Sequence, residues 1–391
     1  MTHKLSKSLM LAALALLWLP AIAFAWNAVT KSKWQSKPLS GVQMTAAPVP
    51  FTLQRVKDGS FQRSMARQIG PSIPFFADAV RLHNQVLYSA FGLTTSRHII
   101  VGKDRFLHNP AYASAYCHRD IESSAEEFER WARMLHEIQD KVEARGQTFL
   151  YVLTPSKIEH LPDTLPTGFP CPSTDQPRFL AAALARLDDH GVKYVDATSG
   201  IDAIRPKYGY DPFPAGGIHW TELAAYPPAL EIIRKINARK GKTIIEPFDI
   251  TVSRTPRAMG SDRDYVELLN LYWEPRSGDL AKISVVGDVP TRCPETVSLV
   301  AVAGSFFDNL GRNLSMAPCP PKLSLLAYFI IHTAHFQNGE MIVDKAPDYS
   351  LLMSSDVVLV EENAGMFLKT THIAALHKYL HTGELPQRAF Y

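Results

Sequence analysis

The chain has 391 residues, of which 46% are hydrophobic, which is enough apolar material for one large domain or two ordinary ones. Lys and Arg number 41 against 38 Asp and Glu, so the formal net charge is +3. With this near balance, and with no basic run that would form a phosphate footprint, the composition gives no case for a nucleic-acid-binding protein.

The amino terminus has the pattern of an export signal. Basic residues are followed by an apolar run over residues 9–25, which ends in the A-x-A pattern of residues 23–25 that precedes signal cleavage. The run is also long enough to remain as an uncleaved anchor, because a span needs about 17–25 residues. Residues 1–25 are therefore predicted to be a signal peptide or signal anchor, and residues 26–60 a linker or arm. The remaining chain is predicted to be exported to the periplasm.

Helix and strand patterns begin at Phe61. Residues 75–92, "FFADAVRLHNQVLYSAFG", place apolar side chains on one helical face, and Gly92 can end that helix. Residues 97–108 read as two short strands joined by a Gly-Lys-Asp turn. The strongest helical pattern follows: Ser123 or Ser124 can cap it, and apolar residues then recur at spacings of three and four until Gly146.

The next segments alternate between strand and helix patterns. Residues 148–155 are predicted to form a strand, residues 178–190 a helix and residues 192–198 a second strand. This rhythm implies an α/β fold in which a parallel sheet is sandwiched by helices. Ligands in such sheets lie beyond the carboxyl ends of the strands.

The second half of the chain completes the predicted domain. A helix near Thr221 should be kinked or split by Pro227 and Pro228. Residues 61–391 are predicted to form one α/β domain, with a less regular insertion at residues 244–288. The other predicted elements are a strand at 297–303, a helix from 308, a strand at 355–362 and a helix at 371–380.

The four cysteines fit an oxidising compartment. None belongs to a C-x-x-C pair, so zinc-ribbon and thioredoxin-like interpretations are poor. Three pairings are possible for Cys117, Cys171, Cys293 and Cys319. Because Cys293 and Cys319 flank the predicted strand at 297–303, a disulfide between them is the expected one.

Ser305 and His219 are the candidate reactive pair. Ser305 follows the apolar strand and Gly304, and a glycine at that point can turn the chain sharply and expose the hydroxyl. A serine hydroxyl becomes a nucleophile only when a nearby base takes its proton. His219, in "GGIHWTELAAY", follows a glycine-rich loop and precedes Thr221, which can cap a helix. It would therefore lie on an exposed loop with a fixed direction.

Five segments in order resemble the SGNH-hydrolase-like AlgJ/AlgX family of alginate O-acetyltransferases. The resemblance covers the chain from about Phe75 to its end. The segments are "FGLTTSRHIIVGKDRFLH", "FLYVLTPSKIEHLPDTLP", "GGIHWTELAAY", "VAGSFFDNL" and "SDVVLVEENAGMF". The resemblance implies an SGNH-hydrolase-like α/β fold in which the histidine motif precedes the serine motif.

The resemblance also assigns roles to individual residues. Ser305 matches the family's nucleophile, His219 its base and Phe306 the aromatic residue after the serine. The family's aspartate, two residues before the histidine, falls on Gly217, and the aspartate of its G-D-S motif falls on Gly304. These two departures leave open whether the chain is an active enzyme.

An active Ser–His pair still needs a group that orients the imidazole. Asp211, upstream in "YDPFPAGGIHW", is the first candidate, because its Pro- and Gly-containing loop can fold back. Asp196, at the end of a predicted strand, and a backbone carbonyl are the alternatives. The serine amide and its neighbours are the expected oxyanion donors, with Asn309 or Asn313 as a weaker side-chain candidate.

Three functions remain open at this stage. The first is a periplasmic O-acetyltransferase that modifies an alginate-like exopolysaccharide through a serine acyl-enzyme; the resemblance implies a membrane-bound O-acyltransferase as acetyl supplier. The second is a scaffold or polysaccharide-binding subunit, and the third is a secreted carbohydrate acetylesterase. No cofactor or metal is implied, and the amino-terminal segment allows association with the inner membrane. The residues that could line a polymer groove are Lys103, Lys157, Arg312, Tyr226 and Trp220.

Overall fold

The structure is a computed structural model that describes residues 36–42, 49–73, 75–287, 293 and 295–385, with scattered residues between 10 and 30. Most of the predicted signal segment, residues 1–25, and parts of the predicted arm lie outside the described residues. Within the described residues, no helix is both long and apolar enough to span a bilayer. The chain divides into two compact units, Met1–Ser96 with Val266–Glu274, and Arg97–Tyr265 with Pro275–Tyr391.

The smaller unit is helical. It contains α2 (Leu53–Lys57), α3 (Ser60–Ser72), α4 (Phe76–Val86) and a π-helical turn (Leu87–Phe91), and Gly92 ends the last in a left-handed conformation, as the sequence predicts. The Asn84 amide donates to the Leu269 carbonyl at 2.8 Å, which fastens the segment Val266–Glu274 to α4. Residues 61–96 thus belong to this unit, whereas the sequence placed the start of the α/β domain at residue 61.

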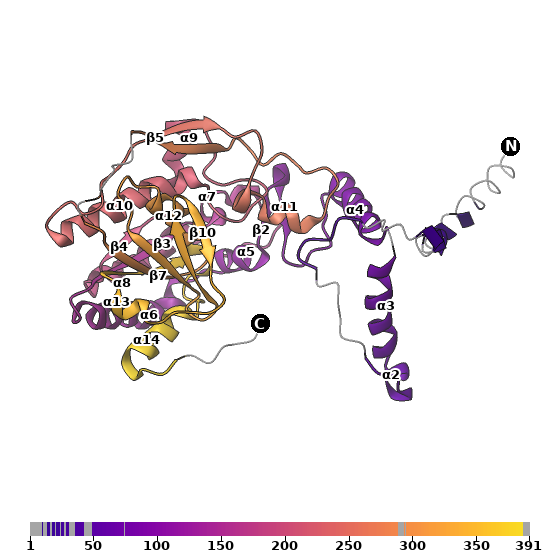
Figure 1. Ribbon diagram of the computed structural model, residues 1–391, viewed down its shortest axis with the longest axis horizontal. Helices are drawn as coiled ribbons and strands as arrows, with labels where there is room; N and C mark the ends of the chain where they lie inside the picture. The colour runs from indigo at the N-terminus through magenta and orange to yellow at the C-terminus, as the bar shows by residue number, and fades with distance from the viewer. Residues whose placement is uncertain are drawn as a thin grey trace. The chain divides into compact units, whose positions relative to one another are not determined.

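The larger unit is built on a seven-stranded sheet in the order β10-β9-β8-β7-β11-β3-β4 (Figure 1). The five strands from β8 to β4 run parallel, and β9 and β10 add an antiparallel edge. The strands are β3 (Thr148–Thr154), β4 (Tyr194–Asp196), β7 (Ser298–Ala303), β8 (Lys322–Ala327), β9 (His332–Gln337), β10 (Glu340–Val343) and β11 (Val357–Asn363).

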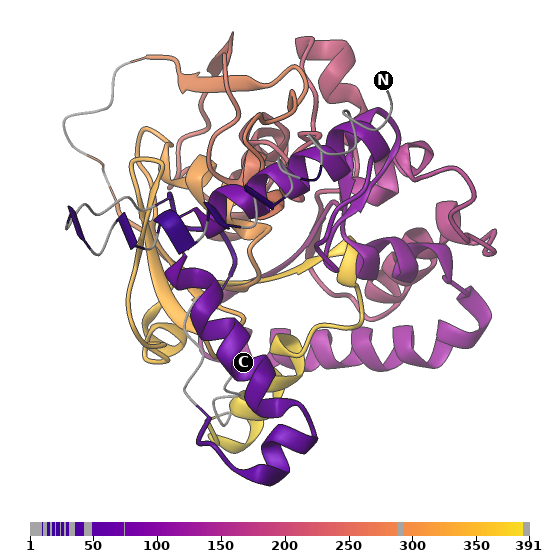
Figure 2. The same ribbon diagram turned by 90° about the vertical axis from the view of Figure 1, so that its right-hand side faces the viewer.

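Helices cover both faces of this sheet (Figures 1 and 2). Alternate residues of β3 point to opposite sides, so Leu150 and Val152 pack in one core while Phe149 and Tyr151 pack in the other. The first core is closed by α10 (Glu222–Lys240) and α12 (Phe307–Ser315); the second is closed by α6 (Ile121–Glu143), α8 (Gln176–Asp189) and α14 (His372–Thr382). The predicted α/β architecture, a mostly parallel sheet between helical layers, is confirmed.

Two helices differ in detail from the sequence predictions. Asp120, and not Ser123 or Ser124, caps α6: its carboxylate accepts the Ser123 amide at 2.6 Å. Helix α10 runs unbroken through Pro227 and Pro228. Its inward face is buried in the core from Leu223 to Ile236, and we attribute the survival of the helix to that packing, which outweighs the backbone hydrogen bonds that the two prolines remove.

The predicted insertion is divided between the two units: Val266–Glu274 belongs to the smaller one, and the residues on either side belong to the larger one. Strands β5 (Ile250–Arg254) and β6 (Ala281–Val285) pair antiparallel, and between them lie a 3-10 turn (Gly260–Arg263) and the start of α11 (Asp264–Leu269). The remaining short elements are β1 (Ile100–Val101), β2 (Leu107–His108), α5 (Pro110–Cys117), α7 (Lys157–His160), α9 (Ile204–Tyr208) and α13 (Leu351–Ser354).

All four cysteines are paired in two disulfides. Cys293 bonds to Cys319, as the sequence predicts, and Cys117 bonds to Cys171. Disulfides persist in oxidising compartments and are rare in the cytosol. The two bonds therefore indicate an extracytoplasmic protein.

Candidate active site

Ser305 lies in a tight turn at the carboxyl end of β7. Strand β7 ends at Ala303, and α12 begins two residues after the serine. The Gly304 amide donates to the Glu361 carboxylate at 2.9 Å, which fixes the turn to β11. A Cβ at Gly304 would lie 3.2 Å from the Tyr328 ring, so a larger residue at this position would require that ring to shift slightly.

His219 is held by groups on both sides of it in the chain. The Trp220 indole is buried and donates to the Phe306 carbonyl at 2.9 Å, which fastens the histidine loop to the serine turn. The Thr221 hydroxyl accepts the Ala224 amide at 3.2 Å and caps α10, as the sequence predicts. The Phe306 ring lies 4.6 Å from the His219 imidazole and restricts its rotation.

Ser305, His219 and Asp264 form a continuous hydrogen-bonded chain. The Ser305 Oγ lies 2.8 Å from His219 Nε2, and His219 Nδ1 lies 2.6 Å from the Asp264 Oδ2. Because a carboxylate only accepts, Nδ1 carries the proton and Nε2 is left to accept the serine proton. The other Asp264 oxygen accepts the Ile218 amide at 2.9 Å, which fixes the carboxylate. The arrangement has the geometry of a serine–histidine–aspartate triad.

The third member of this chain corrects the sequence prediction. Asp211 does not reach His219: its carboxylate pairs with Arg205 and accepts the Asp279 amide at 2.9 Å. The alternative, Asp196, accepts the Thr198 amide at 2.9 Å. Asp264 comes 45 residues after the histidine, inside the insertion that the sequence treated as irregular, and no motif marks it.

The insertion also explains the glycine at position 217. A Cβ on Gly217 would lie 2.8 Å from the carbonyl carbon of Asp262 and closer still to the Ser261 carbonyl oxygen. Real Cβ atoms do not make such contacts, so the insertion backbone occupies the space that the family's aspartate side chain would need. In this chain the carboxylate arrives from the insertion instead.

The Tyr328 hydroxyl is hydrogen bonded to both the side chain and the backbone amide of Ser305. The Tyr328 hydroxyl lies 3.3 Å from the Ser305 amide and 3.3 Å from its Oγ. Neither predicted asparagine takes this place. The Asn309 amide donates to the Trp220 carbonyl at 2.5 Å, and the Asn313 amide donates to the Glu222 carbonyl at 2.9 Å. Both asparagines tie α12 to the start of α10.

Buried ionisable groups surround the triad. Lys157 donates to the carbonyls of Leu107 and Gly217, and burial lowers its pKa to about 7. Burial raises the pKa of Glu361, beneath the serine turn, to about 7. It also raises the pKa of Asp262 to about 7 and that of Asp308 to about 6, although both carboxyls lie near His219. Several groups near the triad therefore change charge close to neutral pH.

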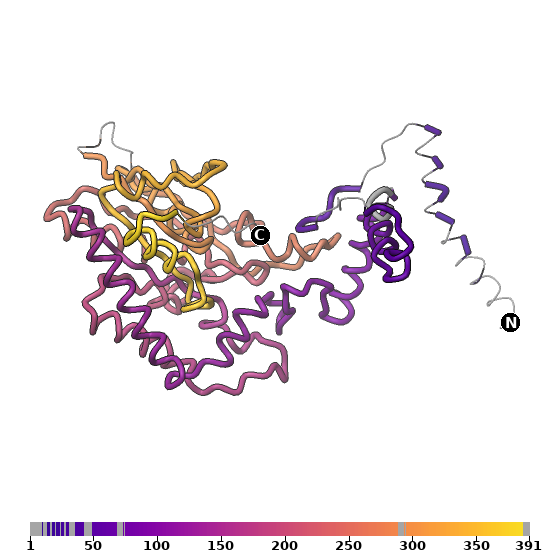
Figure 3. The backbone as a smooth tube through the Cα atoms, turned by 90° about the horizontal axis from the view of Figure 1, so that it is seen from below, coloured from indigo at the N-terminus to yellow at the C-terminus, as the bar shows by residue number. Residues whose placement is uncertain are grey.

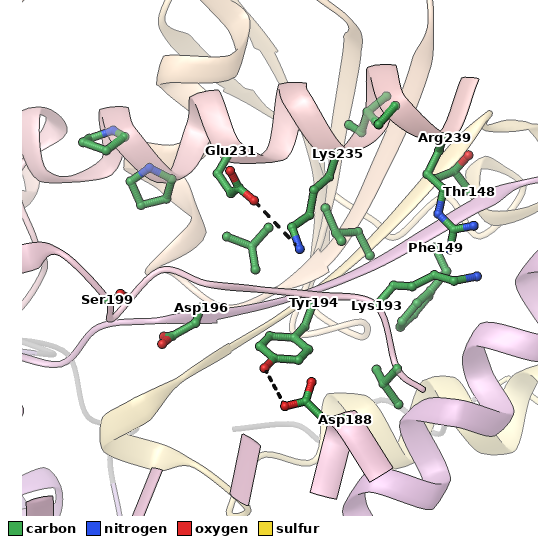
Figure 4. Close-up of a pocket in the computed structure, with 17 residues that line it drawn as sticks. Thr148, Phe149, Asp188, Lys193, Tyr194, Asp196, Ser199, Glu231, Lys235 and Arg239 are labelled. Atoms are coloured by element: carbon green, nitrogen blue, oxygen red, sulfur yellow. Dashed lines mark hydrogen bonds and ion pairs between the residues drawn. The ribbon is translucent and has the colours of Figure 1, made fainter. Parts of the chain in front are cut away.

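Cavities among the described residues of the larger unit include two of substantial volume. One, of about 290 Å³, is lined by Asp262, Asp308 and Arg312 among others and lies beside the insertion. The larger one, of about 860 Å³, lies between the edge strand β4 and α10, and its lining in Figure 4 includes Tyr194, Lys235 and Arg239. No triad residue lines the larger cavity, so its size does not identify it as the active site.

The residues predicted for a polymer groove are placed differently from that expectation. Lys157, Trp220 and Tyr226 are buried, and the Arg312 guanidinium donates to the Gly339 carbonyl at 2.6 Å. Lys103 is exposed on a short turn. The buried members of the group support the loops around the triad and do not offer a surface to a polymer.

The family model of the SGNH hydrolase-like domain of acetyltransferase AlgX matches residues 99–304, which is just over half of the 391 residues. The chain therefore belongs to this family of SGNH hydrolase-like acetyltransferases. The matched region contains His219 and Asp264 and ends directly before Ser305.

The solved structures similar to this chain include three of low sequence identity. The O-acetyltransferase domain of Pseudomonas putida AlgJ is 14% identical, with a TM-score of 0.45, over 72% of this chain and 98% of that one. Pseudomonas aeruginosa AlgX is 14% identical, with a TM-score of 0.43, over 73% of this chain and 67% of that one. Bacillus cereus PatB1 is 13% identical, with a TM-score of 0.42, over 69% of this chain and 96% of that one. No curated protein sequence matches the chain.

Proposed function

We propose that the protein is a periplasmic O-acetyltransferase that acetylates an alginate-like exopolysaccharide through a serine acyl-enzyme. The observation that carries the proposal is the Ser305–His219–Asp264 hydrogen-bonded chain. Membership of the AlgX acetyltransferase family supports acetyl as the group transferred. The acetyl supplier is a membrane-bound O-acyltransferase, and the amino-terminal segment keeps the protein at or near the inner membrane.

The residues have complementary roles in the proposed reaction. The Ser305 oxygen attacks the acetyl carbonyl carbon of the donor while His219 Nε2 takes the serine proton. Asp264 holds the imidazole in the required tautomer and stabilises the imidazolium that forms. Collapse of the tetrahedral intermediate releases the donor group, to which His219 returns the proton. A sugar hydroxyl then repeats the attack on the acyl-enzyme, with His219 again as base.

The oxyanion of each tetrahedral intermediate needs donors beside the serine. The Tyr328 hydroxyl donates to Ser305 Oγ and accepts the Ser305 amide, so the amide and the hydroxyl are two donors beside the serine. In the structure the Ser305 amide donates to the Tyr328 hydroxyl oxygen at 3.3 Å, so in the proposed reaction the incoming carbonyl oxygen replaces the Tyr328 oxygen as acceptor of the amide and accepts the hydroxyl proton as well. Preorganised donors of this kind are often the largest single contribution to catalysis.

The alternatives make different predictions about the acceptor. The hypothesis of an inactive scaffold rests on the missing aspartate at position 217, and the Asp264 carboxylate beside His219 removes that reason. A secreted acetylesterase would use the same triad with water as acceptor. The proposal is therefore tested by measuring transfer and hydrolysis together.

The test uses the purified exported chain with a chromogenic acetate ester, with and without mannuronate oligosaccharides as acceptor. Mass spectrometry should find acetylated oligosaccharide, and a trapped acetyl group on the peptide that contains Ser305. Ser305→Ala should lower both rates by a factor of about 10⁶, as in other serine enzymes of this type. Ser315→Ala is the matched control, because that serine is buried in α12 and bonds to the Arg312 carbonyl.

Three results would contradict the proposal. Ester turnover without acetylated oligosaccharide would favour the esterase. Equal turnover in Ser305→Ala and the wild type would remove the serine acyl-enzyme. No activity in vitro, together with normal polymer acetylation by Ser305→Ala in cells, would favour the scaffold.

A further inference from the structure

The C-terminal helix α14 packs beside the long helix α6 (Figures 1 and 3). Two histidines of α14, His377 and His381, are four residues apart, so they share one side of the helix. Their ring centroids lie 4.2 Å apart. Glu137 reaches across from α6, and its Oε2 lies 2.5 Å from His377 Nε2.

These three side chains bring metal-binding atoms together. One donor atom from each lies within 4.8 Å of the other two, and among the described residues no other group of three His, Cys, Asp or Glu side chains does so. Tetrahedral zinc, with bonds of about 2.0–2.1 Å, needs donor atoms roughly 3.3 Å apart. Small rotamer changes close that gap, because Glu137 is 43% exposed, His377 is 28% exposed and His381 is exposed.

The orientation of His381 suits a metal ligand. Its Nδ1 lies 2.9 Å from the His377 carbonyl oxygen and donates its proton there. That bond fixes the tautomer and leaves the Nε2 lone pair unprotonated. Metal-bound imidazoles are usually oriented in this way, by an outer acceptor on the second ring nitrogen.

We infer that Glu137, His377 and His381 form a zinc site that ties the C-terminal helix to α6. The ligands are the Glu137 carboxylate and one ring nitrogen from each histidine, with water in the fourth position. Zinc replaces the proton that His377 and Glu137 share in the metal-free state. No triad residue takes part, so this site is independent of the proposed acetyltransferase function.

The charge of Arg133 opposes a bound cation and must be counted. Arg133 lies one helical turn before Glu137 on α6. Its guanidinium is 3.5 Å from the Glu129 carboxylate, which offsets part of its charge. Glu137 and the two neutral imidazoles then leave the zinc site with a net charge near +1, a charge that partly exposed groups tolerate.

The test is a zinc titration of the exported chain, prepared without a polyhistidine tag and treated with EDTA. Calorimetry with zinc chloride should give one bound ion per chain. Glu137→Gln, His377→Gln and His381→Gln should each weaken binding by more than about tenfold, because even outer partners of metal ligands typically matter by 10–100-fold. Both disulfides occupy all four cysteines, so thiols do not compete.

His190→Gln is the matched control. His190 Nε2 lies 2.8 Å from the carboxylate of Glu129, which belongs to α6 like Glu137. The side chains of His190 and Glu129 are 23% and 43% exposed, close to the 28% and 43% of His377 and Glu137. The His190–Glu129 pair belongs to no such three-residue group among the described residues, so its loss should leave zinc binding unchanged.

His381→Gln also separates folding from binding, because His381 bonds within its own helix and should leave the metal-free unfolding temperature unchanged. The absence of saturable zinc binding by the wild type would overturn the inference. Equal loss of binding in His190→Gln and His377→Gln would overturn it as well.

Discussion

The serine turn and the insertion both supply the triad, yet they are built in different ways. The turn is a short connection between two buried elements, β7 and α12, and the Glu361 carboxylate anchors it from below. The insertion has a small two-stranded sheet and irregular chain, with Asp264 at the start of a short helix. Ser305 is therefore positioned by the regular elements on either side of it, whereas Asp264 is positioned by a contact between segments far apart in the chain.

The difference shows how an apparent loss in a motif can be compensated. A glycine at position 217 looks like a missing catalytic aspartate when only the motif is considered. In the fold, the insertion backbone fills the space next to Gly217 and brings Asp264 to the same imidazole nitrogen. Loss of one carboxylate and gain of the other therefore belong together, and an aspartate at 217 would be incompatible with the insertion.

Among the variants that compare the two regions, the one that removes the carboxylate of the insertion has the largest expected effect. Asp264→Asn should lower kcat for ester turnover by about 10⁴, because an amide at this position favours the wrong imidazole tautomer. Steady-state kinetics would measure the effect, and KM should change little because Asp264 does not contact the acyl group in the proposed mechanism.

Asp211→Asn is the control for that variant. Asp211 bonds to Arg205 and to the Asp279 amide, so its loss should leave kcat unchanged and lower the free energy of unfolding only slightly. If Asp211→Asn instead loses as much activity as Asp264→Asn, the triad geometry described above is wrong.

The sequence predicts much of the architecture because regular elements leave periodic patterns. The strands at 148–155 and 297–303 and the helix of residues 75–92 are recovered to within a few residues. The structure brings Ser305 and His219 within hydrogen-bond distance, because Ser305 lies in the turn after β7 and His219 lies just before the cap of α10; their catalytic roles stay a prediction. The sequence does not predict Asp264, because its position depends on how a 45-residue segment folds back, and no local pattern encodes that contact. The sequence predicts a break in helix α10, because the cost of two prolines in a helix is visible in the local sequence. The core packing that keeps the helix intact involves residues far apart in the chain, so the local sequence does not show it.

The next effect tests the serine turn. Tyr328→Phe should lower kcat by about 10²–10³, the typical result of removing one oxyanion donor. Rates with the acetate ester would measure this effect. Tyr194→Phe is the control: its hydroxyl faces Asp188 in the larger cavity (Figure 4), and its loss should not change turnover. Unchanged turnover in Tyr328→Phe would contradict the proposal that the Tyr328 hydroxyl is an oxyanion donor together with the Ser305 amide.

Gly217→Asp tests directly whether the insertion and the motif exclude each other. The added side chain must displace the backbone at Ser261 and Asp262, and Asp264 with it. A shift of about 1 Å in such a group can lower kcat by about 10²-fold. We expect that loss together with a lower unfolding temperature. Gly383→Ala places its added carbon in open space but strains a left-handed backbone (φ 72°), so it should lower the unfolding temperature somewhat and leave kcat unchanged. A higher kcat in Gly217→Asp would contradict this expectation, because it would mean that the insertion backbone can move to accommodate the new side chain without loss of the active geometry.

The smallest expected effect concerns the pH dependence of the insertion. Burial raises the pKa of Asp262 to about 7, so this carboxyl becomes charged only as pH rises through neutrality. Its charge then favours the His219 imidazolium that forms in the transition state. Asp262→Asn should therefore lower kcat/KM a few-fold at pH 8 and leave it almost unchanged at pH 6, a modest effect because the two groups are not in direct contact.

The same variant has an opposite and separable effect on stability. Between about pH 4 and pH 7 the folded protein keeps a proton on Asp262 that the unfolded chain has already released. The free energy of unfolding of the wild type therefore falls as pH rises through this window. Asp262→Asn lacks that fall, so it should gain roughly 1–2 kcal/mol over the wild type between pH 5 and pH 8, after allowance for partial solvent screening. Urea unfolding at both pH values measures the difference. A variant that loses activity at pH 8 without gaining stability would show that Asp262 is already ionised below neutrality, and that the insertion carries its charge permanently.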